Sequence, residues 1–308
     1  MIAGTFTIRR AEGVERRRIT GLLLPGPAER DADVIVATEA HGEEPIGAAA
    51  VWFTPSRRFP ERADCVVHVL EPHRRRGVGR ALLGRVTAVA REIGVRQLGT
   101  RPLEPKSPGF QFLLACGFEF GAATISCEVP IENLANVTRP LYERMEKRGK
   151  IPNGARIIPL SEAPREEVCR LVLDNLGFSS QHVAERLRGT EHGFSQTISR
   201  VALLNGKLVG ALLITYQKAL ASVDATAVLP HYRHTWVNAA LKYFAFEELI
   251  ARGVERVRFS ANSAQHRDTV NLATRTKARV LKTIFIAALD LEKDRAEGAT
   301  VSDDRAGR

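Results

Sequence analysis

The chain repeats itself once, and this repeat restricts the fold more than any other feature of the sequence. Identical residues recur at one spacing of 159 positions: Val69 and Val228, Arg74 and Arg233, and Gly94-Val95 and Gly253-Val254. Longer segments align as well, for example IGAAAVWF (46–53) with VGALLITY (209–216). Because a solenoid needs at least three repeats to bury its faces, this pattern predicts two copies of one globular fold.

The repeat predicts a domain boundary near residue 150. The segment LYERMEKRG (141–149) is typical of a short charged helix, and KIPNGA (150–155) is a turn-rich linker. We therefore expect one domain over residues 1–149 and a second over residues 150–292. The last segment, residues 293–308, has few apolar residues and is expected to be disordered.

Each copy is expected to fold as strand, helix, hairpin, strand, helix, strand, helix and strand. In the first copy, ADCVVHVL (63–70) is a largely apolar strand, and residues 77–93 carry apolar side chains at helical spacing. A short helix over 110–118 and a last strand over 123–131 follow. The second copy has its long helix at 236–253. This order of elements predicts the α/β (α+β) class.

Composition excludes several classes of protein. The net charge is +10, but residues 1–150 hold 23 Lys and Arg against 18 Asp and Glu, and residues 151–308 hold 22 against 17. This even balance fits an anionic ligand, and a nucleic-acid partner is not expected without a basic stripe. No apolar run reaches the roughly 20 residues of a membrane helix, and the first residues lack the apolar core of a secretion signal.

Cysteine and histidine spacing gives no sign of a metal or of disulfides. The four cysteines are scattered, so we expect reduced thiols and a cytoplasmic location. His231 and His234 lie three residues apart without a third ligand nearby in the sequence, so no metal site is expected.

A glycine loop in the first copy is the strongest functional motif. The segment VLEPHRRRGVGRALL (69–83) places three arginines and Gly-Val-Gly between a strand and the start of a helix. The first N–H groups of a helix lack partners within the helix, and glycine lets a phosphate approach them closely. The loop therefore predicts a cradle for a pyrophosphate. A solvated arginine-rich turn is the alternative, whereas the P-loop and dinucleotide motifs do not fit the spacing.

The second copy keeps the frame of this loop without its glycines. In VLPHYRHTWVNAAL (228–241), Trp236 and Asn238 stand where the first copy has Gly77 and Gly79. A large side chain at a position where the backbone must touch a phosphate predicts weak or lost binding in this copy.

These residues resemble the GNAT N-acetyltransferase superfamily, which binds acetyl-CoA through an Arg/Gln-x-x-Gly-x-Gly/Ala loop. Here the motif is Arg74-x-x-Gly77-x-Gly79, preceded by Val69, and FLLACGF (112–118) is similar to the family's terminal Gly-Phe element. The resemblance covers about residues 5–131. It implies two tandem GNAT-like domains, the second degenerate, each with a mixed, mostly antiparallel twisted sheet flanked by helices.

The resemblance also assigns the ligand and its contacts. The cosubstrate is acetyl-CoA. It is expected to touch the end of the central strand and the loop that follows: Val69, Leu70, Arg74, Arg75, Arg76, Gly77, Val78, Gly79 and Arg80. The thioester is expected in a splay between the central strand and the next one, where the backbone around Val69 and Leu70 should be unpaired and hold the pantetheine and the oxyanion.

Family members often place an acidic base on the central strand. Strand alternation puts Asp64 and His68 on one face, and either could take the amine proton directly or through water. The family's usual acid is a tyrosine, and Leu113 stands at its place. The acid is therefore water, a residue of the second copy, or unnecessary.

Three functions remain open at this stage. The first is acetyl transfer from acetyl-CoA to a primary amine of a small molecule or a protein, in the first copy. The second is acyl transfer with a phosphopantetheine carrier, whose acidic surface the positive charge would attract. The third is a non-catalytic acyl-CoA-binding or scaffold role, which the missing tyrosine favours. The intact glycine loop and the polar strand pair favour an enzyme.

Overall fold

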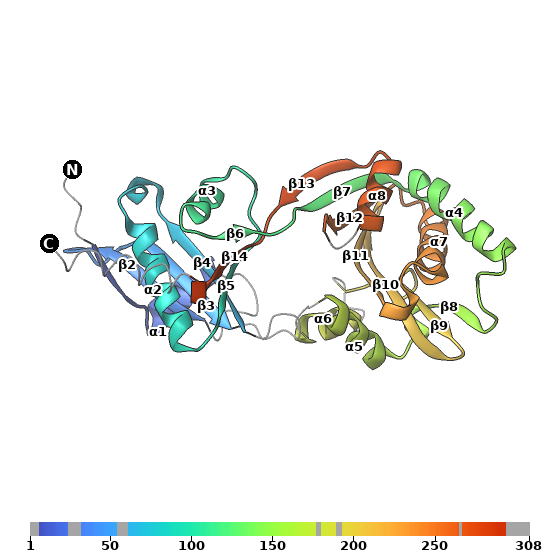
Figure 1. Ribbon diagram of the computed structural model, residues 1–308, viewed down its shortest axis with the longest axis horizontal. Coiled ribbons are helices and arrows are strands. Elements are labelled where there is room, and N and C mark those ends of the chain that lie inside the picture. Colours follow the sequence, from blue (N-terminus) through green and yellow to red (C-terminus); the bar gives the residue numbers. More distant parts are fainter. Residues whose placement is uncertain are drawn as a thin grey trace. The chain divides into compact units, whose positions relative to one another are not determined.

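The computed structural model describes residues 6–23, 32–53, 61–176, 180–188, 193–264 and 267–293. These residues form two compact units (Figure 1). Of the described residues, unit 1 holds those up to Gly121 and those from Ile284 onward, and unit 2 holds Ala122–Thr283.

Unit 1 is built on a seven-stranded sheet in the order β1-β2-β3-β4-β5-β14-β6. Its strands are β1 (Phe6–Arg10), β2 (Asp33–Glu39), β3 (Pro45–Phe53), β4 (Arg62–Val69), β5 (Gln97–Thr100), β6 (Glu119–Phe120) and β14 (Ala287–Asp290). Its helices are α1 (Gly13–Leu23), α2 (Val78–Glu92) and α3 (Pro108–Leu114). Neighbouring strands pair antiparallel except β4 and β5, which are parallel.

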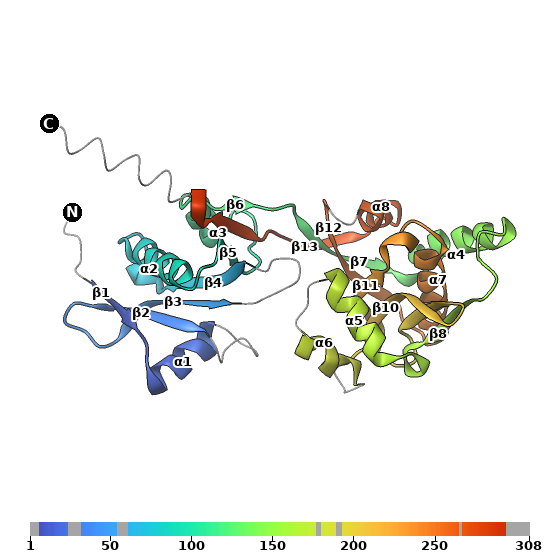
Figure 2. The same ribbon diagram turned by 60° about the horizontal axis from the view of Figure 1, so that its bottom comes forward.

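The two faces of this sheet carry different helices. Figure 2 shows α1 on one side of β1–β3 and α2 on the other. Alternation along β4 sends Ala63 and Cys65 into the core under α2, where Leu82 and Val86 are fully buried. Val66 packs in the smaller cluster that contains Ile19 of α1. The side chains that alternate with Cys65 therefore lie on the α1 face.

Unit 2 repeats this plan with the strand order β13-β7-β12-β11-β10-β9-β8. Its strands are β7 (Thr124–Pro130), β8 (Ala155–Pro159), β9 (Arg200–Leu204), β10 (Lys207–Gln217), β11 (Leu220–Val228), β12 (Arg256–Asn262) and β13 (Arg279–Ile284). Its helices are α4 (Ile131–Lys147), α5 (Arg165–Leu176), α6 (Ser180–Leu187), α7 (Trp236–Ala251) and α8 (Arg267–Arg275).

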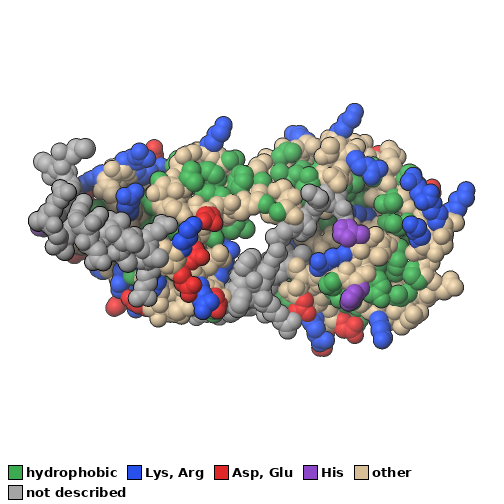
Figure 3. All heavy atoms as spheres, viewed as in Figure 1, with side chains coloured by type: hydrophobic (Ala, Val, Ile, Leu, Met, Phe, Trp, Pro, Cys, Tyr) green, Lys and Arg blue, Asp and Glu red, His purple; other side chains and the backbone are tan. Residues whose placement is uncertain are grey.

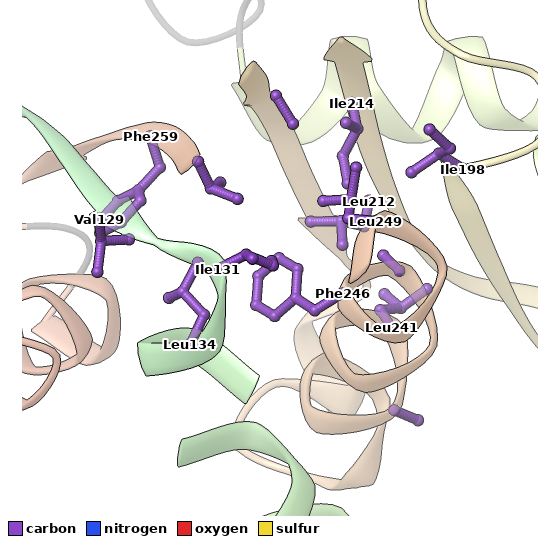
Figure 4. Close-up of a cluster of buried hydrophobic side chains, with 14 of the residues drawn as sticks. Val129, Ile131, Leu134, Ile198, Leu212, Ile214, Leu241, Phe246, Leu249 and Phe259 are labelled. Atoms are coloured by element: carbon purple, nitrogen blue, oxygen red, sulfur yellow. The ribbon is translucent and has the colours of Figure 1, made fainter. Parts of the chain in front are cut away.

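The main core of unit 2 lies between the sheet, α4 and α7. Figure 4 shows Ile131 and Leu134 of α4 beside Phe246 of α7, with Leu212 and Ile214 of β10 nearby. The helix that was expected over 141–149 is the second half of α4, which begins at Ile131 directly after β7.

The same close contact between a sheet glycine and the long helix occurs in both units. Gly47 and Gly210 are equivalent positions in the two sheets. A Cβ on Gly47 would lie 3.2 Å from Leu82 and 3.3 Å from Val78, and one on Gly210 would lie 2.6 Å from Val237 and 3.3 Å from Leu241. Both glycines let the long helix approach its sheet closely. The fold is therefore two copies of one domain, as the sequence predicts.

The two units exchange one strand each. The last strand expected in the first copy, β7, pairs with β12 of unit 2, with Cys127 opposite Phe259. In return β14 lies between β5 and β6 of unit 1, with Ala288 opposite Gly99. In Figure 1 the red β14 lies among strands from the blue end of the chain, and the green β7 beside β12 and β13.

This exchange changes the domain boundaries expected from the repeat. Residues 122–149 belong to unit 2 and the described residues from Ile284 onward to unit 1, so the ranges 1–149 and 150–292 do not describe the two units. The physical reason is that a short apolar strand can complete either sheet by the same backbone hydrogen bonds. In unit 1 the strand between β5 and β6 is β14, which comes from the second copy. In unit 2 the strand between β12 and β13 is β7, which comes from the first copy.

Residues 294–308 of the tail that was expected to be disordered lie outside the described residues. Among the helices described, none has both the length and the apolar character needed to cross a membrane.

Candidate active site

The loop before α2 is shaped by two left-handed residues. Arg75 has φ 63° and Gly77, the N-cap of α2, has φ 86°. Gly77 offers no side chain to cap the helix, so the N–H groups of the first turn have no side-chain acceptor from this position. They point outward at the positive end of the helix dipole, which is where an anion binds most favourably.

Gly79 lies in the first turn of α2, between two apolar side chains. A Cβ on Gly79 would be 3.4 Å from Phe112 of α3 and 3.5 Å from Val69 of β4. A methyl group fits there, but any larger side chain must displace Phe112 or occupy the space in front of the helix. At Gly77, by contrast, an added Cβ would meet no described atom within 4 Å, so this side of the cradle is open.

The arginines of the loop have different partners. Arg74 donates from Nε to the Val69 carbonyl oxygen at 3.0 Å and fixes the loop to the end of β4. Arg76 lies 3.1 Å from Nδ1 of His73 and 3.5 Å from the Glu39 carboxylate. Arg75 and Arg80 are exposed. Their guanidinium groups are available to phosphate oxygens.

Strands β4 and β5 separate where the thioester was expected. Their parallel register ends at the pair Cys65 and Thr100, and β4 continues to Val69. On its other edge β4 stays paired with β3 up to Val69 opposite Gly47. The residues of β4 beyond Cys65 therefore have one paired edge and one edge that faces the opening.

The direction of the backbone groups corrects one expectation. Leu70 donates its N–H to the Ile46 carbonyl at 3.0 Å, and its own carbonyl accepts from the His73 N–H at 2.9 Å. The prediction that the Leu70 backbone is unpaired is therefore wrong, because this residue points toward β3. By strand alternation the N–H groups of Val67 and Val69 point into the opening.

Asp64 forms an ion pair that the sequence reasoning missed. The Arg62 guanidinium donates to Oδ1 of Asp64 from Nε at 2.8 Å and from Nη2 at 2.6 Å. The two side chains share a face because they lie two positions apart on β4. A Cβ on Gly99 of β5 would clash with the Arg62 guanidinium, so a larger residue there would require this side chain to move.

His68 lies on the same face as Asp64 and is exposed. Its register partner on β3 is Ala48, beyond the last β4–β5 pair. Asp64 is opposite Gly99, where β5 is still paired. At about 3.3 Å per residue, Asp64 lies roughly 10 Å from Val67 along the strand, whereas His68 is its neighbour. The structure thus places His68, and not Asp64, beside the opening between the strands.

The position of the family's tyrosine is filled by a buried leucine. Leu113 is 7 % exposed and packs in the core under α2. Cys116, near the end of α3, is half-buried, and burial raises the pKa of its thiol while the nearby Arg80 opposes that rise. Neither side chain is an ionised acid in the opening.

The equivalent loop of unit 2 keeps only part of this geometry. Arg233 donates to the Val228 carbonyl at 3.4 Å, and His234 has φ 59°, as Arg74 and Arg75 do in unit 1. Gly77, the second left-handed residue of the unit 1 loop, has no left-handed counterpart in the described loop of unit 2. Its equivalent, Trp236, is already the first residue of α7 and is only 4 % exposed in the main core.

The N-cap of α7 is Thr235, in an extended conformation and with no side-chain capping hydrogen bond. Asn238 takes the place of Gly79, and its Oδ1 is buried without a hydrogen-bond partner among the described atoms. The loop therefore has one left-handed residue and two large side chains where unit 1 has two left-handed residues and two glycines.

On the face shown in Figure 3, Lys and Arg side chains are scattered among other types. Among the described residues, no group of three or more His, Cys, Asp or Glu side chains could hold a metal ion.

Comparison with known proteins identifies the first unit. The model of the acetyltransferase (GNAT) family matches residues 9–118. Residues 9–118 are a GNAT acetyltransferase domain. This match contains the cradle, β4 and α3, and it supports acetyl transfer as the general class of activity of the GNAT domain. No curated protein is significantly similar to the chain.

Solved structures extend the likeness of fold to both units. A tandem GNAT protein from the clavulanic acid biosynthesis pathway is 17 % identical, with a TM-score of 0.52 over 92 % of this chain and 90 % of that one. A GCN5-related N-acetyltransferase from Sphaerobacter thermophilus is 12 % identical, with a TM-score of 0.55 over 93 % and 96 %.

A third similar structure is the glucosamine N-acetyltransferase region of a fungal multi-domain GH3 β-N-acetylglucosaminidase. It is 11 % identical, with a TM-score of 0.65 over 93 % of this chain. The chain spans 38 % of the length of that protein. At these identities the likeness shows the fold alone: two GNAT-like domains in tandem.

Proposed function

We propose that unit 1 is an acetyl-CoA-dependent N-acetyltransferase that acts on a primary amine, and that unit 2 does not bind acetyl-CoA. The observation that carries the proposal is the cradle at the start of α2. There the left-handed Gly77 and the open space around it leave the helix N–H groups accessible. A pyrophosphate fits such a site by charge and by hydrogen bonding.

The opening between β4 and β5 supports the same proposal. A pantetheine chain that starts at the cradle would run along Val69 toward Val67, where the N–H groups face the opening. One of these N–H groups would bind the thioester oxygen and stabilise it as negative charge develops. The side chains of Phe112 and Val69 form the apolar wall beside Gly79.

The chemistry needs few groups from the protein. The amine nitrogen attacks the thioester carbon, a C–N bond forms, and the C–S bond breaks with release of the CoA thiolate. The ammonium proton must leave, and we assign its removal to His68, directly or through water, because it is exposed beside the opening. Asp64 would help to position Arg62 rather than take a proton. A thiolate is a tolerable leaving group, so Leu113 in place of tyrosine does not prevent the reaction.

Calorimetry with acetyl-CoA and release of free CoA thiol in the presence of a panel of amines test the proposal. We expect one acetyl-CoA site per chain and amine-dependent release. Binding without release from any amine would support the non-catalytic acyl-CoA-binding role instead. Release only with an acylated or free carrier protein would support the carrier reaction. Absence of binding would overturn the proposal altogether.

A further inference from the structure

An arginine on the α1 face of unit 1 lacks an acidic partner among the described residues. The guanidinium carbon of Arg101 lies 5.8 Å from the centroid of the Trp52 ring, a cation–π contact. Both side chains are half-buried. Within the described part of the chain, the Arg101 guanidinium has no ion pair or hydrogen bond besides this contact. Among the described residues no carboxylate neutralises this guanidinium, so its donors can bind an anionic group.

The position of Arg101 connects it to the proposed reaction. Thr100 is the last residue of β5 to pair with β4, so Arg101 follows at the point where the strands separate. Trp52 is opposite Asp64 on β3, and it packs with Val66 in the cluster on the α1 face. The guanidinium therefore lies over β4 at the mouth of the opening. At about 3.3 Å per residue, Val67 is roughly 7 Å beyond the last paired residue of β4.

The neighbouring charges leave Arg101 available to a ligand. The Asp64 carboxylate is held by Arg62, at 2.6 Å, and Gly99 gives that guanidinium its place on the sheet. The Arg62–Asp64 pair is neutral overall, so Asp64 does not neutralise Arg101. The guanidinium lies over the face of the Trp52 indole, at 5.8 Å from its centroid, and its planar fork of N–H donors suits a carboxylate.

We propose that Arg101, which lies over the Trp52 ring, binds a carboxylate of the amine acceptor. The substrate class is then a small amino acid-like amine, with the carboxylate a few bonds from the reacting nitrogen. The carboxylate would anchor on Arg101 while the amine reaches the thioester near Val67. This inference rests on the proposed acetyl transfer and names the acceptor for it.

Matched acceptors test the proposal directly. Glycine, β-alanine and 4-aminobutyrate are compared with methylamine, ethylamine and propylamine, which have the same chains without the carboxylate. We expect at least one amino acid of the series to have a kcat/KM well above that of its partner amine. Equal values, or a preference for the plain amines, would overturn the inference.

Variants then assign the preference to one side chain. Arg101→Gln should lower kcat/KM for the preferred amino acid by roughly 10- to 100-fold, the usual loss of a hydrogen bond to a charged group. It should leave kcat/KM for the plain amine within about twofold. Arg101→Lys should recover only part of the loss, because it keeps the charge without the fork. Arg85→Gln, at an exposed arginine paired with Glu92 on α2, is the charge-matched control. An equal loss for both acceptor series in Arg101→Gln would contradict the assignment.

A binding measurement separates this inference from the proposed function. The chain has two tryptophans, so Trp236→Phe leaves Trp52 as the only one. In that variant, titration with the three amino acids should change the tryptophan fluorescence to saturation. Titration with the plain amines should give no saturable change in fluorescence. Titration of the double variant Trp236→Phe, Arg101→Gln with the amino acids should give none either. An unchanged circular dichroism spectrum and cooperative thermal unfolding show that Trp236→Phe is folded.

The two failures are then distinct. If no amine is acetylated but the fluorescence still reports carboxylate binding at Trp52, acetyl transfer fails and the carboxylate site stands. If amines are acetylated without any saturable fluorescence change and without a preference for the carboxylate, the site fails and acetyl transfer stands.

Discussion

Replacement of Gly77 separates backbone strain from ligand contact in the cradle. Its φ of 86° is a conformation that L-residues adopt at a cost, so Gly77→Ala should destabilise unit 1 by about 1–2 kcal/mol. The new methyl group meets no atom of the described residues within 4 Å and would stand in the open space before the helix N–H groups. If it prevents one charge-assisted hydrogen bond to a phosphate oxygen, the loss is about 1.5–3 kcal/mol, or roughly 10- to 100-fold in Kd.

Two further variants make this measurement decisive. Gly84→Ala adds a methyl group on the exposed side of the same helix, at an ordinary helical φ and with no atom within 4 Å. It should raise stability by about 0.8–1 kcal/mol and leave the acetyl-CoA affinity unchanged. Gly77→Asn should lose affinity with less strain, because asparagine tolerates the left-handed region. Calorimetry with acetyl-CoA and thermal unfolding monitor the two quantities. The reasoning is refuted if Gly77→Ala and Gly77→Asn bind acetyl-CoA as tightly as Gly84→Ala.

Further predictions follow from other parts of the chain. His68→Gln should lower kcat/KM for an amine acceptor by about 10²–10⁴-fold, whereas Asp64→Asn should have a smaller effect; the reverse order would show that Asp64 is the base. Gly210→Ala should destabilise unit 2 by about 1–3 kcal/mol, measured by denaturant unfolding, because its Cβ would lie 2.6 Å from Val237. A hydrogen bond from Arg258 lowers the pKa of Glu128 despite its burial. The charged form of Glu128 therefore stabilises the fold at pH values above the usual glutamate pKa. This stabilisation is lost as the pH falls through the lowered pKa of Glu128. In thermal unfolding, Glu128→Gln should therefore lose less stability than the unmodified protein as the pH is lowered.

The repeat and the glycine loop predicted most of what positions the site. The spacing of 159 residues predicted two copies, and the residues between Val69 and Gly79 predicted a strand, a tight loop and a helix start. These features are local, so the neighbouring sequence determines them. The Arg62–Asp64 pair could also have been predicted from the sequence, because residues two apart on a strand share a face.

The strand exchange was not predictable from the same patterns. The segment ATISCEV is typical of a strand whichever sheet it joins, because alternation says which face is buried and does not say which strand lies alongside. The contact of Trp52 with Arg101 was hidden for a similar reason. It joins β3 to the end of β5 across β4, and only the register of three strands brings the two side chains together.

The exchanged strand also sets an order for folding during synthesis. The Thr100 side chain hydrogen-bonds to the backbone of Ala287, 187 residues further along the chain, so the ribosome must synthesise the chain through β14 before the sheet of unit 1 can close. Until then β5 and β6 lack the strand between them, and β5 presents an unpaired edge. A chain truncated near residue 149 would contain every residue of the cradle and still lack this strand. We therefore expect unit 1 to complete its sheet only after the second copy has been synthesised, so the second copy would be a folding partner of the first.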